Sequence, residues 1–96
     1  MSRATTYRFR LYVAGEAENS ARALANLKAI CAASLSRPHI IEVVDVFKEP
    51  QRALADRIFM TPTLVKLEPA PVRTIVGTLS DADIVLSALG LHVIAV

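Results

Sequence analysis

The side chains that could do chemistry in this chain are few and widely spaced. Its thiol and imidazole groups are one cysteine, Cys31, and two histidines, His39 and His92. Disulfide exchange needs two thiols close together, with the attacking thiolate favoured near a helix N-terminus. A zinc site needs several cysteine or histidine ligands at short spacing. The sequence therefore predicts neither a dithiol redox centre nor a metal site.

Other catalytic patterns are also missing. The three glycines, Gly15, Gly77 and Gly90, are too far apart to form a phosphate-binding loop. Asp81 and Asp83 resemble a paired-carboxylate site, but they stand where a helix is expected to begin. Carboxylates in that position cap the helix and interact with its dipole. We expect no catalytic residue and no cofactor.

Composition and charge narrow the class of protein further. The chain has 96 residues, of which 53% are hydrophobic and 21% charged, and this mixture is typical of one folded domain. Eleven basic residues against nine acidic ones give a net charge of +2, and the basic residues are spread along the chain rather than clustered as in nucleic-acid binders. The longest uncharged stretch, residues 84–96, is shorter than the roughly 20 apolar residues of a membrane span. We expect a soluble, cytoplasmic protein without nucleic-acid or membrane partners.

The first half of the chain predicts a strand, a helix and a second strand. Apolar and polar side chains alternate over residues 7–13, as in a strand. A helix is expected to start at a cap formed by Asn19 or Ser20 and to end at Arg37-Pro38. Residues 40–46 are rich in β-branched side chains and predict a strand covered on both faces, parallel to the first. The helix should bury an apolar stripe formed by Leu24, Leu27, Cys31 and Leu35.

The second half predicts a short helix, two strands and a last helix. Pro50 suits the first turn of a helix that extends to about Ile58. Residues 61–67 and 72–76 predict strands, and the connector between them is too short for a crossover, so the two should be antiparallel. Ser80 and Asp83 have capping-box spacing for a final helix, which Gly90 should end. The order βαβαββα predicts a thioredoxin-like α/β sandwich.

A thioredoxin-like fold makes a redox enzyme the first alternative to weigh. The position of the reactive thiol in such proteins corresponds to residues 14–20, which contain no cysteine and two carboxylates, Glu16 and Glu18. Cys31 lies on the apolar stripe of the first helix, where a small buried hydrophobic side chain is expected. Thr61-Pro62 resembles the cis-proline turn of thioredoxin-like proteins, which is explained by a structural role alone. A thioredoxin-type redox activity is therefore the less favoured function.

Short motifs along most of the chain resemble the KaiB family of circadian clock proteins. The resemblance covers residues 7–91 of a single domain, 1–96, and leaves 1–6 and 92–96 as tails. It also extends to the sensor domain of a clock-associated histidine kinase. The motifs are Leu11-Tyr12-Val13-Ala14-Gly15, Asn19-Ser20, Arg22-Ala23-Leu24, Val44-Asp45-Val46, Pro50, Thr61-Pro62-Thr63-Leu64, Pro71-Val72-Arg73 and Gly77-Thr78-Leu79-Ser80-Asp81.

This resemblance implies a regulatory function rather than catalysis. KaiB proteins bind the N-terminal ring of the hexameric ATPase KaiC and modulate its phosphorylation cycle, and in cyanobacteria the complex captures KaiA and competes with the histidine kinase. The family is metamorphic: a resting form of order βαββααβ, usually tetrameric, converts to a thioredoxin-like monomer that binds KaiC. Alternatives are an interaction module for a histidine kinase, or a stress-response regulator without KaiA, since the hydrophobic end Leu91–Val96 departs from the acidic tail of cyanobacterial members.

The resemblance also assigns candidate site residues. Four basic residues match positions implicated in docking onto KaiC, although each could equally be a solvated surface charge: Arg22, Arg57, Lys66 and Arg73. Pro62, Pro71 and Gly77 are the candidate turn and fold-switch residues. Strand-forming residues at Ile84–Leu86 and Leu91–Val96 lie in or after a segment with a good helix cap, which is a conflict expected where two packings compete.

Overall fold

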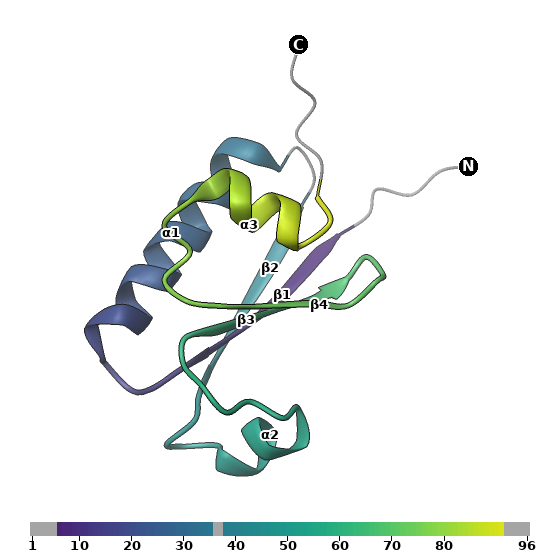
Figure 1. Ribbon diagram of the computed structural model, residues 1–96. Helices are drawn as coiled ribbons and strands as arrows, with labels where there is room; N and C mark the ends of the chain where they lie inside the picture. The colour runs from purple at the N-terminus through teal and green to yellow at the C-terminus, as the bar shows by residue number, and fades with distance from the viewer. Residues whose placement is uncertain (1–5, 36–37, 92–96) are drawn as a thin grey trace.

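The secondary-structure elements follow the predicted order βαβαββα. The computed structural model describes residues 6–35 and 38–91, and within them this thioredoxin-like order is confirmed (Figure 1). Of the predicted tails 1–6 and 92–96, all but residue 6 lie outside the described residues, as does the predicted helix end at Arg37. The strands are β1 (Tyr7–Val13), β2 (His39–Asp45), β3 (Thr63–Glu68) and β4 (Arg73–Val76), and the helices are α1 (Glu18–Ser34), α2 (Pro50–Ala55) and α3 (Ala82–Ala88).

The strands form one mixed sheet in the order β2-β1-β3-β4. β1 and β2 are parallel, with Tyr7 opposite His39 and Val13 opposite Asp45, as predicted for a β-α-β unit. β3 is antiparallel both to β1 and to β4, which confirms the antiparallel pair expected from the short connector. The two halves of the chain therefore meet at the pairing of β1 with β3.

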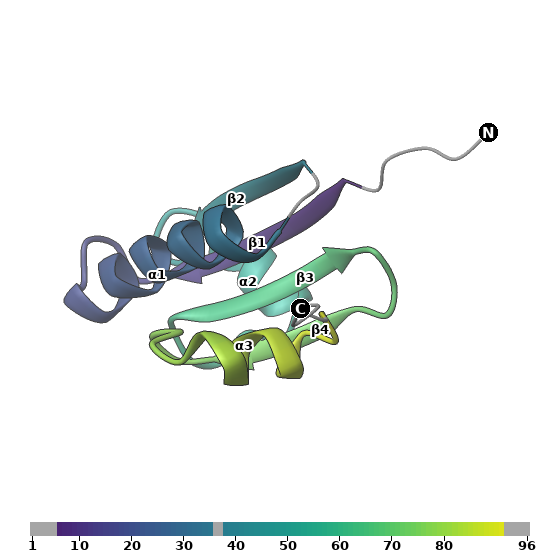
Figure 2. The ribbon, with the colours of Figure 1, turned by 90° about the horizontal axis from the view of Figure 1, so that it is seen from above.

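Helices cover both faces of the sheet (Figures 1 and 2). On one face Phe9, Leu11 and Val13 of β1 pack in a cluster with buried residues of α1 and α3. On the other face Tyr12 packs with Ala53 of α2 and with buried residues of β2 and β3. Successive side chains of a strand point to opposite faces, so the alternation seen in the sequence separates these two cores.

Helix α1 keeps the predicted apolar stripe but begins earlier than predicted. Leu27 and Cys31 are buried, and Leu24 and Leu35 pack against the same cluster. The predicted cap at Asn19 or Ser20 is wrong, because the N-cap residue is Ala17 and no side chain caps the helix. The Ser20 hydroxyl instead accepts a hydrogen bond of 3.1 Å from the backbone N–H of Ala14, which fixes the turn between β1 and α1.

Strand β2 lies at the edge of the sheet, and the prediction that both of its faces are covered holds only in part, since Ile41 packs against the cluster with α1 and Val44 against α2. Ile40 and Val43 are 47% and 44% exposed, whereas Val44, which faces α2, is fully buried. β-branched residues favour strands at edges as well as at centres, and the pattern therefore fixes the strand but not its neighbours. One side of β2 has no paired strand among the described residues.

The last two helices differ from prediction at their ends. α2 ends at Ala55 rather than near Ile58. The N-cap of α3 is Asp81, whose side chain accepts a hydrogen bond from the N–H of Ile84, so the predicted cap at Ser80 is displaced by one residue. Gly90 follows the helix with a positive φ of 72°, as predicted for its end. None of the helices in the described part of the chain is long and apolar enough to cross a membrane.

Candidate protein-interaction surface

The structure brings together two of the four basic residues predicted to dock a partner. Lys66 on β3 and Arg73 on β4 are directly opposite each other in the antiparallel pair. Arg22 lies on α1 and Arg57 follows α2, and these two helices cover opposite faces of the sheet. The four positions therefore do not form one contiguous basic patch.

Lys66 is buried, so the alternative of a solvated surface charge is wrong for this residue. It is only 1% exposed, and its Nζ donates a hydrogen bond of 2.7 Å to the carbonyl oxygen of Pro69. Burial lowers the pKa of the ammonium, and the neighbouring positive charge of Arg73 lowers it further. β3 is a central strand with both faces covered, which places even a lysine in the interior.

Arg22 and Arg73 have exposed side chains. Arg22 pairs with Glu18 one turn earlier on α1 at 2.9 Å, and both side chains are well exposed to solvent. Such i,i+4 pairs contribute only about 0.3–0.5 kcal/mol, so Arg22 is available to a partner at little cost. Arg73 begins β4 and makes no ion pair within residues 6–35 and 38–91. Both arginines can therefore contact an acidic surface.

Arg57 occupies a backbone position that normally favours glycine. Its φ is +57°, and it follows Asp56, the C-cap residue of α2. The N–H of Ile58 donates to the carbonyl of Ala53 at 2.8 Å and the N–H of Arg57 to that of Leu54 at 3.1 Å, which together form a Schellman motif. In this motif glycine is the usual residue at the left-handed position. Arg57 therefore adopts a strained backbone conformation, as does Leu79 with a φ of 61°.

Replacing Arg57 with glycine is expected to stabilise the fold while weakening partner binding. A non-glycine residue in the left-handed region costs about 1–2 kcal/mol, and the extra flexibility of glycine in the unfolded chain offsets about half of this gain. We expect the free energy of unfolding to rise by about 0.5–1 kcal/mol in urea titrations. A loss of stability would contradict the assigned turn geometry.

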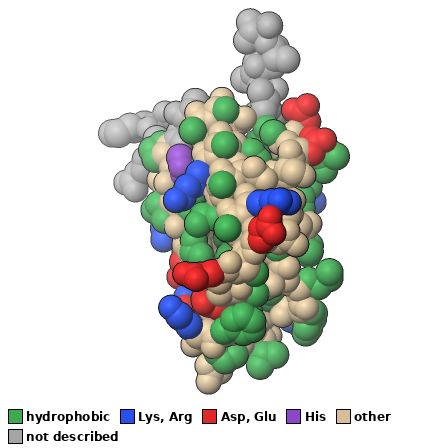
Figure 3. Space-filling model, turned by 90° about the vertical axis from the view of Figure 1, so that its left-hand side faces the viewer, with side chains coloured by type: hydrophobic (Ala, Val, Ile, Leu, Met, Phe, Trp, Pro, Cys, Tyr) green, Lys and Arg blue, Asp and Glu red, His purple; other side chains and the backbone are tan. Residues whose placement is uncertain are grey.

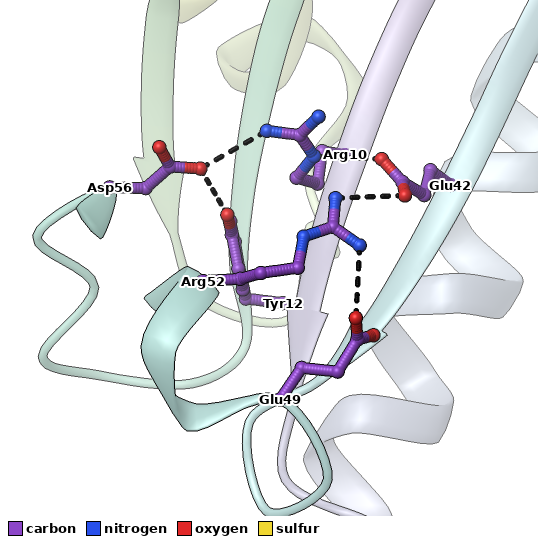
Figure 4. Close-up of polar contacts among 6 residues, drawn as sticks. All are labelled: Arg10, Tyr12, Glu42, Glu49, Arg52 and Asp56. Atoms are coloured by element: carbon purple, nitrogen blue, oxygen red, sulfur yellow. Dashed lines mark hydrogen bonds and ion pairs between the residues drawn. The ribbon is translucent and has the colours of Figure 1, made fainter. Parts of the chain in front are cut away.

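A network of ion pairs and hydrogen bonds connects α2 to the face of the sheet that this helix covers (Figure 4). Arg10 on β1 donates to Glu42 on β2 at 2.8 Å and to Asp56 at 3.1 Å. The hydroxyl of Tyr12 also donates to Asp56, so this carboxylate has two donors from the same strand. Arg52 on α2 donates to Glu42 at 2.8 Å and to Glu49 at 3.3 Å. The network joins β1, β2, α2 and the residue before Arg57.

The electrostatics keep the pair of Arg10 and Glu42 charged at neutral pH. Hydrogen bonds from Arg10 and then Arg52 hold the pKa of Glu42 below its ordinary value. The hydrogen bond to Glu42 raises the pKa of Arg10, and burial followed by Asp56 raises the pKa of Tyr12, which remains a donor. Glu42 is therefore ionised and the phenol of Tyr12 protonated. Sequence reasoning missed this cluster because its members are up to 46 residues apart.

The predicted turn residues lie at the two ends of the antiparallel pair formed by β3 and β4. The Thr61-Pro62 peptide bond is cis, as are those before Pro69 and Pro71. The N–H of Gly77 donates a hydrogen bond of 3.0 Å to the carbonyl of Pro62, which joins the start of β3 to the end of β4. Gly77 has a φ of 126°, a region that side chains rarely adopt, so glycine is required by this turn. Pro71 is exposed in the connector between the strands.

Residues 14–20, which correspond to the position of the reactive thiol in thioredoxin-like proteins, adjoin a cavity but contain no cysteine. A cavity of about 360 Å³ lies between the β1–α1 turn, α1 and β2, and Gly15, Glu16 and Ser20 are among its lining residues. The hydroxyl of Ser20 is already bonded to the backbone. Cys31 lies elsewhere on α1, 1% exposed, and burial raises its pKa to about 11. In the described residues no three histidine, cysteine or carboxylate side chains converge on a common point.

Cys31 is expected to resist alkylation in the folded protein. A thiol with a pKa near 11 has about one part in a thousand as thiolate at pH 8, and burial also blocks the reagent. Mass spectrometry after iodoacetamide treatment at pH 8 should show an unmodified chain, and full modification in 8 M urea. Rapid alkylation without denaturant would contradict the burial of this thiol.

Large hydrophobic side chains are exposed at the end of the molecule that α2 occupies. Figure 3 shows hydrophobic side chains gathered at this lower end. Phe47, Phe59 and Met60 are 75%, 81% and 63% exposed, and Ile58 alone separates Arg57 from Phe59 and Met60. Exposed aromatic and methionine side chains are typical of protein-interaction sites. Sequence reasoning assigned the basic residues of this region but not these apolar ones.

Comparisons with known proteins agree with this geometry. The family model described as the KaiB domain matches residues 10–91. The circadian clock oscillator protein KaiB of Synechococcus elongatus is 48% identical over 91 residues, which span 95% of this chain and 89% of the relative. The corresponding protein of Gloeothece citriformis is 49% identical over 86 residues, 90% of this chain and 81% of the relative.

Solved structures extend the likeness to the fold. The N-terminal domain of Synechococcus elongatus SasA superposes with a TM-score of 0.77 at 26% identity, covering 94% of this chain and 89% of that domain. Chloroplastic thioredoxin z superposes with a TM-score of 0.69 at 19% identity, covering 88% of this chain and 76% of the thioredoxin. The second likeness concerns the fold alone.

Proposed function

Since the chain belongs to the KaiB family, we propose that it is a non-catalytic timing regulator that binds a KaiC-type ATPase ring and modulates its phosphorylation cycle. The observation that carries the proposal is the match to the KaiB domain over residues 10–91. Membership of the family gives a clock-related protein-interaction role, and the KaiC-type ring is the partner we assign to it. The cytoplasm is the compartment in which we expect the two to meet.

The exposed side chains support docking rather than catalysis. Arg22, Arg57 and Arg73 are exposed on three different elements. Charged groups at the rim of an interface accelerate encounter and select partners of opposite charge. We propose that these three arginines contact carboxylates of the ring, and that buried Lys66 acts indirectly by fixing the β3–β4 connection through Pro69.

We further propose that the described fold is the binding-competent member of two architectures. The alternative has the order βαββααβ and forms a resting dimer or tetramer. Residues Ile84–Leu86 are helical here although their side chains favour strands. The segment that would rearrange contains the predicted turn residues Pro62, Pro71 and Gly77. The ring would then select a minor state, and the observed affinity is reduced by the population of that state.

The likeness to the SasA domain favours a second candidate. That domain shares this fold at 26% identity, and the sequence resembles the sensor domain of a clock-associated histidine kinase. A chain of this shape could act as an interaction module toward a histidine kinase, or toward KaiA, rather than toward the ring. The two candidate functions therefore predict binding to different partner proteins.

Capture experiments distinguish these functions. A KaiC-type ring with ATP and a SasA-type kinase are immobilised separately on interferometry sensors, and the chain is the analyte. We expect binding to the ring, and displacement of a pre-bound SasA-type sensor domain by the chain. Binding to the kinase alone would replace the first function with the second, and binding to neither would reject both.

A further inference from the structure

Phe59 and Met60 form an exposed apolar ridge directly after the strained turn at Arg57. Their side chains are 81% and 63% exposed, although the preceding residue, Ile58, packs into the core formed with α2. Exposed large apolar side chains that adjoin one another are unfavourable in water unless they have a partner. The ridge defined by Phe59 and Met60 is therefore a feature that folding alone does not explain.

The ridge separates two hollows. One has a volume of about 260 Å³ and reaches from Asp56 and Arg57 to Thr74 and Val76 on the sheet. The other has a volume of about 200 Å³, and Ala14, Val46 and Phe47 line it on the far side of the ridge. Ile58, Phe59 and Met60 line both hollows. A ridge between two apolar hollows suits a partner that inserts one hydrophobic side chain on each side.

We propose that the Phe59–Met60 ridge is the apolar centre of the docking surface, and that it receives hydrophobic side chains from an acidic segment of the KaiC-type ATPase. The inference rests on the proposed function and deepens it by assigning the residues that bury apolar area. Clusters of desolvated aromatic and methionine side chains supply most of the affinity of protein interfaces. The arginines assigned above then form the rim around this centre.

Charge at the edge of the ridge identifies an acidic partner. Lys48 follows Phe47 and Arg57 lies two residues before Phe59, and neither basic residue makes an ion pair within the described ranges 6–35 and 38–91. The one carboxylate lining either hollow, Asp56, is occupied by Arg10 and Tyr12. The uncompensated charge at this surface is therefore positive, which favours carboxylates on the partner.

The test measures the affinity of the full chain for a KaiC-type ring in the presence of ATP. The ridge variant carries Phe59→Ser and Met60→Ser, which remove exposed side chains and should leave the fold intact. The matched control is Ile40→Ser, because Ile40 is 47% exposed and lies near the start of β2, whereas the ridge follows α2, which comes after the end of that strand. A rim variant carries Arg57→Gln and Lys48→Gln, and each affinity is measured at 50 and 300 mM NaCl.

We expect the ridge variant to bind at least tenfold more weakly and the control within twofold of the wild type. The rim variant should bind more weakly and lose part of the salt dependence. A ridge variant that binds like the wild type would overturn the inference and leave the proposed function standing. Absence of wild-type binding would overturn both. If the ridge variant binds the ring normally but its mass without the ring, measured by light scattering, differs from that of the wild type, the ridge is a self-association surface. That result would also overturn the inference.

Discussion

Replacing Arg73 with glutamate is expected to weaken binding to the KaiC-type ring ten- to a hundredfold without destabilising the fold. The reversed charge would face carboxylates of the partner, and like charges across an interface cost several kcal/mol. The fold should tolerate the change because Arg73 is opposite Lys66, whose pKa its positive charge lowers. A glutamate there would replace repulsion by attraction across the strands.

The control for Arg73 is the same charge change elsewhere. Lys28→Glu alters the net charge equally, on an exposed position of α1 that is not among the predicted docking residues. Interferometry with immobilised ring should show an affinity near that of the wild type for this control. Equal affinities of the Arg73→Glu protein and the wild type would contradict a docking role for Arg73. An equal loss of affinity in the Arg73→Glu and Lys28→Glu proteins would show that the loss comes from the net charge alone.

Replacing Asp56 with alanine is expected to lower the free energy of unfolding by about 1–2 kcal/mol. The carboxylate accepts hydrogen bonds from Arg10 and from Tyr12, and its loss leaves the hydroxyl of a buried tyrosine without its acceptor. The Asp56 side chain is 38% exposed, so water replaces part of what is lost. Binding to the ring should weaken as well, because Asp56 fixes the turn that carries Arg57 and the ridge.

The matched control for Asp56 is Glu49→Ala. Glu49 belongs to the same network, but its contact with Arg52 is an exposed i,i+3 pair of 3.3 Å. We expect a change within about 0.5 kcal/mol for this variant in urea denaturation. A double-mutant cycle of Tyr12→Phe and Asp56→Ala should give a positive coupling energy. Equal stabilities of the Asp56 and Glu49 variants would refute the central position of Asp56 in the network.

Local signals predicted the elements better than their ends and their neighbours. Alternation at β1, the proline at the start of α2 and the short connector before β4 each depend on nearby residues, and all three predictions are confirmed. The start of α1 was wrong because the hydroxyl of Ser20 binds the preceding turn instead of capping the helix. The edge position of β2, which leaves Ile40 and Val43 partly exposed, could not be predicted because strand order depends on pairing between distant segments.

The residues of the candidate interaction surface were harder to predict from the sequence than the helices and strands, because their exposure depends on the fold. The resemblance selected Lys66 as a docking residue, but only the central place of β3 reveals that its side chain is buried. Conversely, the sequence analysis did not single out Phe59 and Met60, whose side chains are exposed after the turn at Arg57. The network of Arg10, Glu42 and Asp56 joins three elements, so no spacing in the sequence could indicate it.

Size-exclusion chromatography with light scattering, run with a KaiC-type ring and ATP, tests the central claim most directly. The account predicts that the chain alone elutes with the mass of a dimer or tetramer, and that with the ring it joins a larger complex slowly as binding-competent monomers are selected. A chain that elutes apart from the ring after long incubation in ATP and in ADP would contradict it.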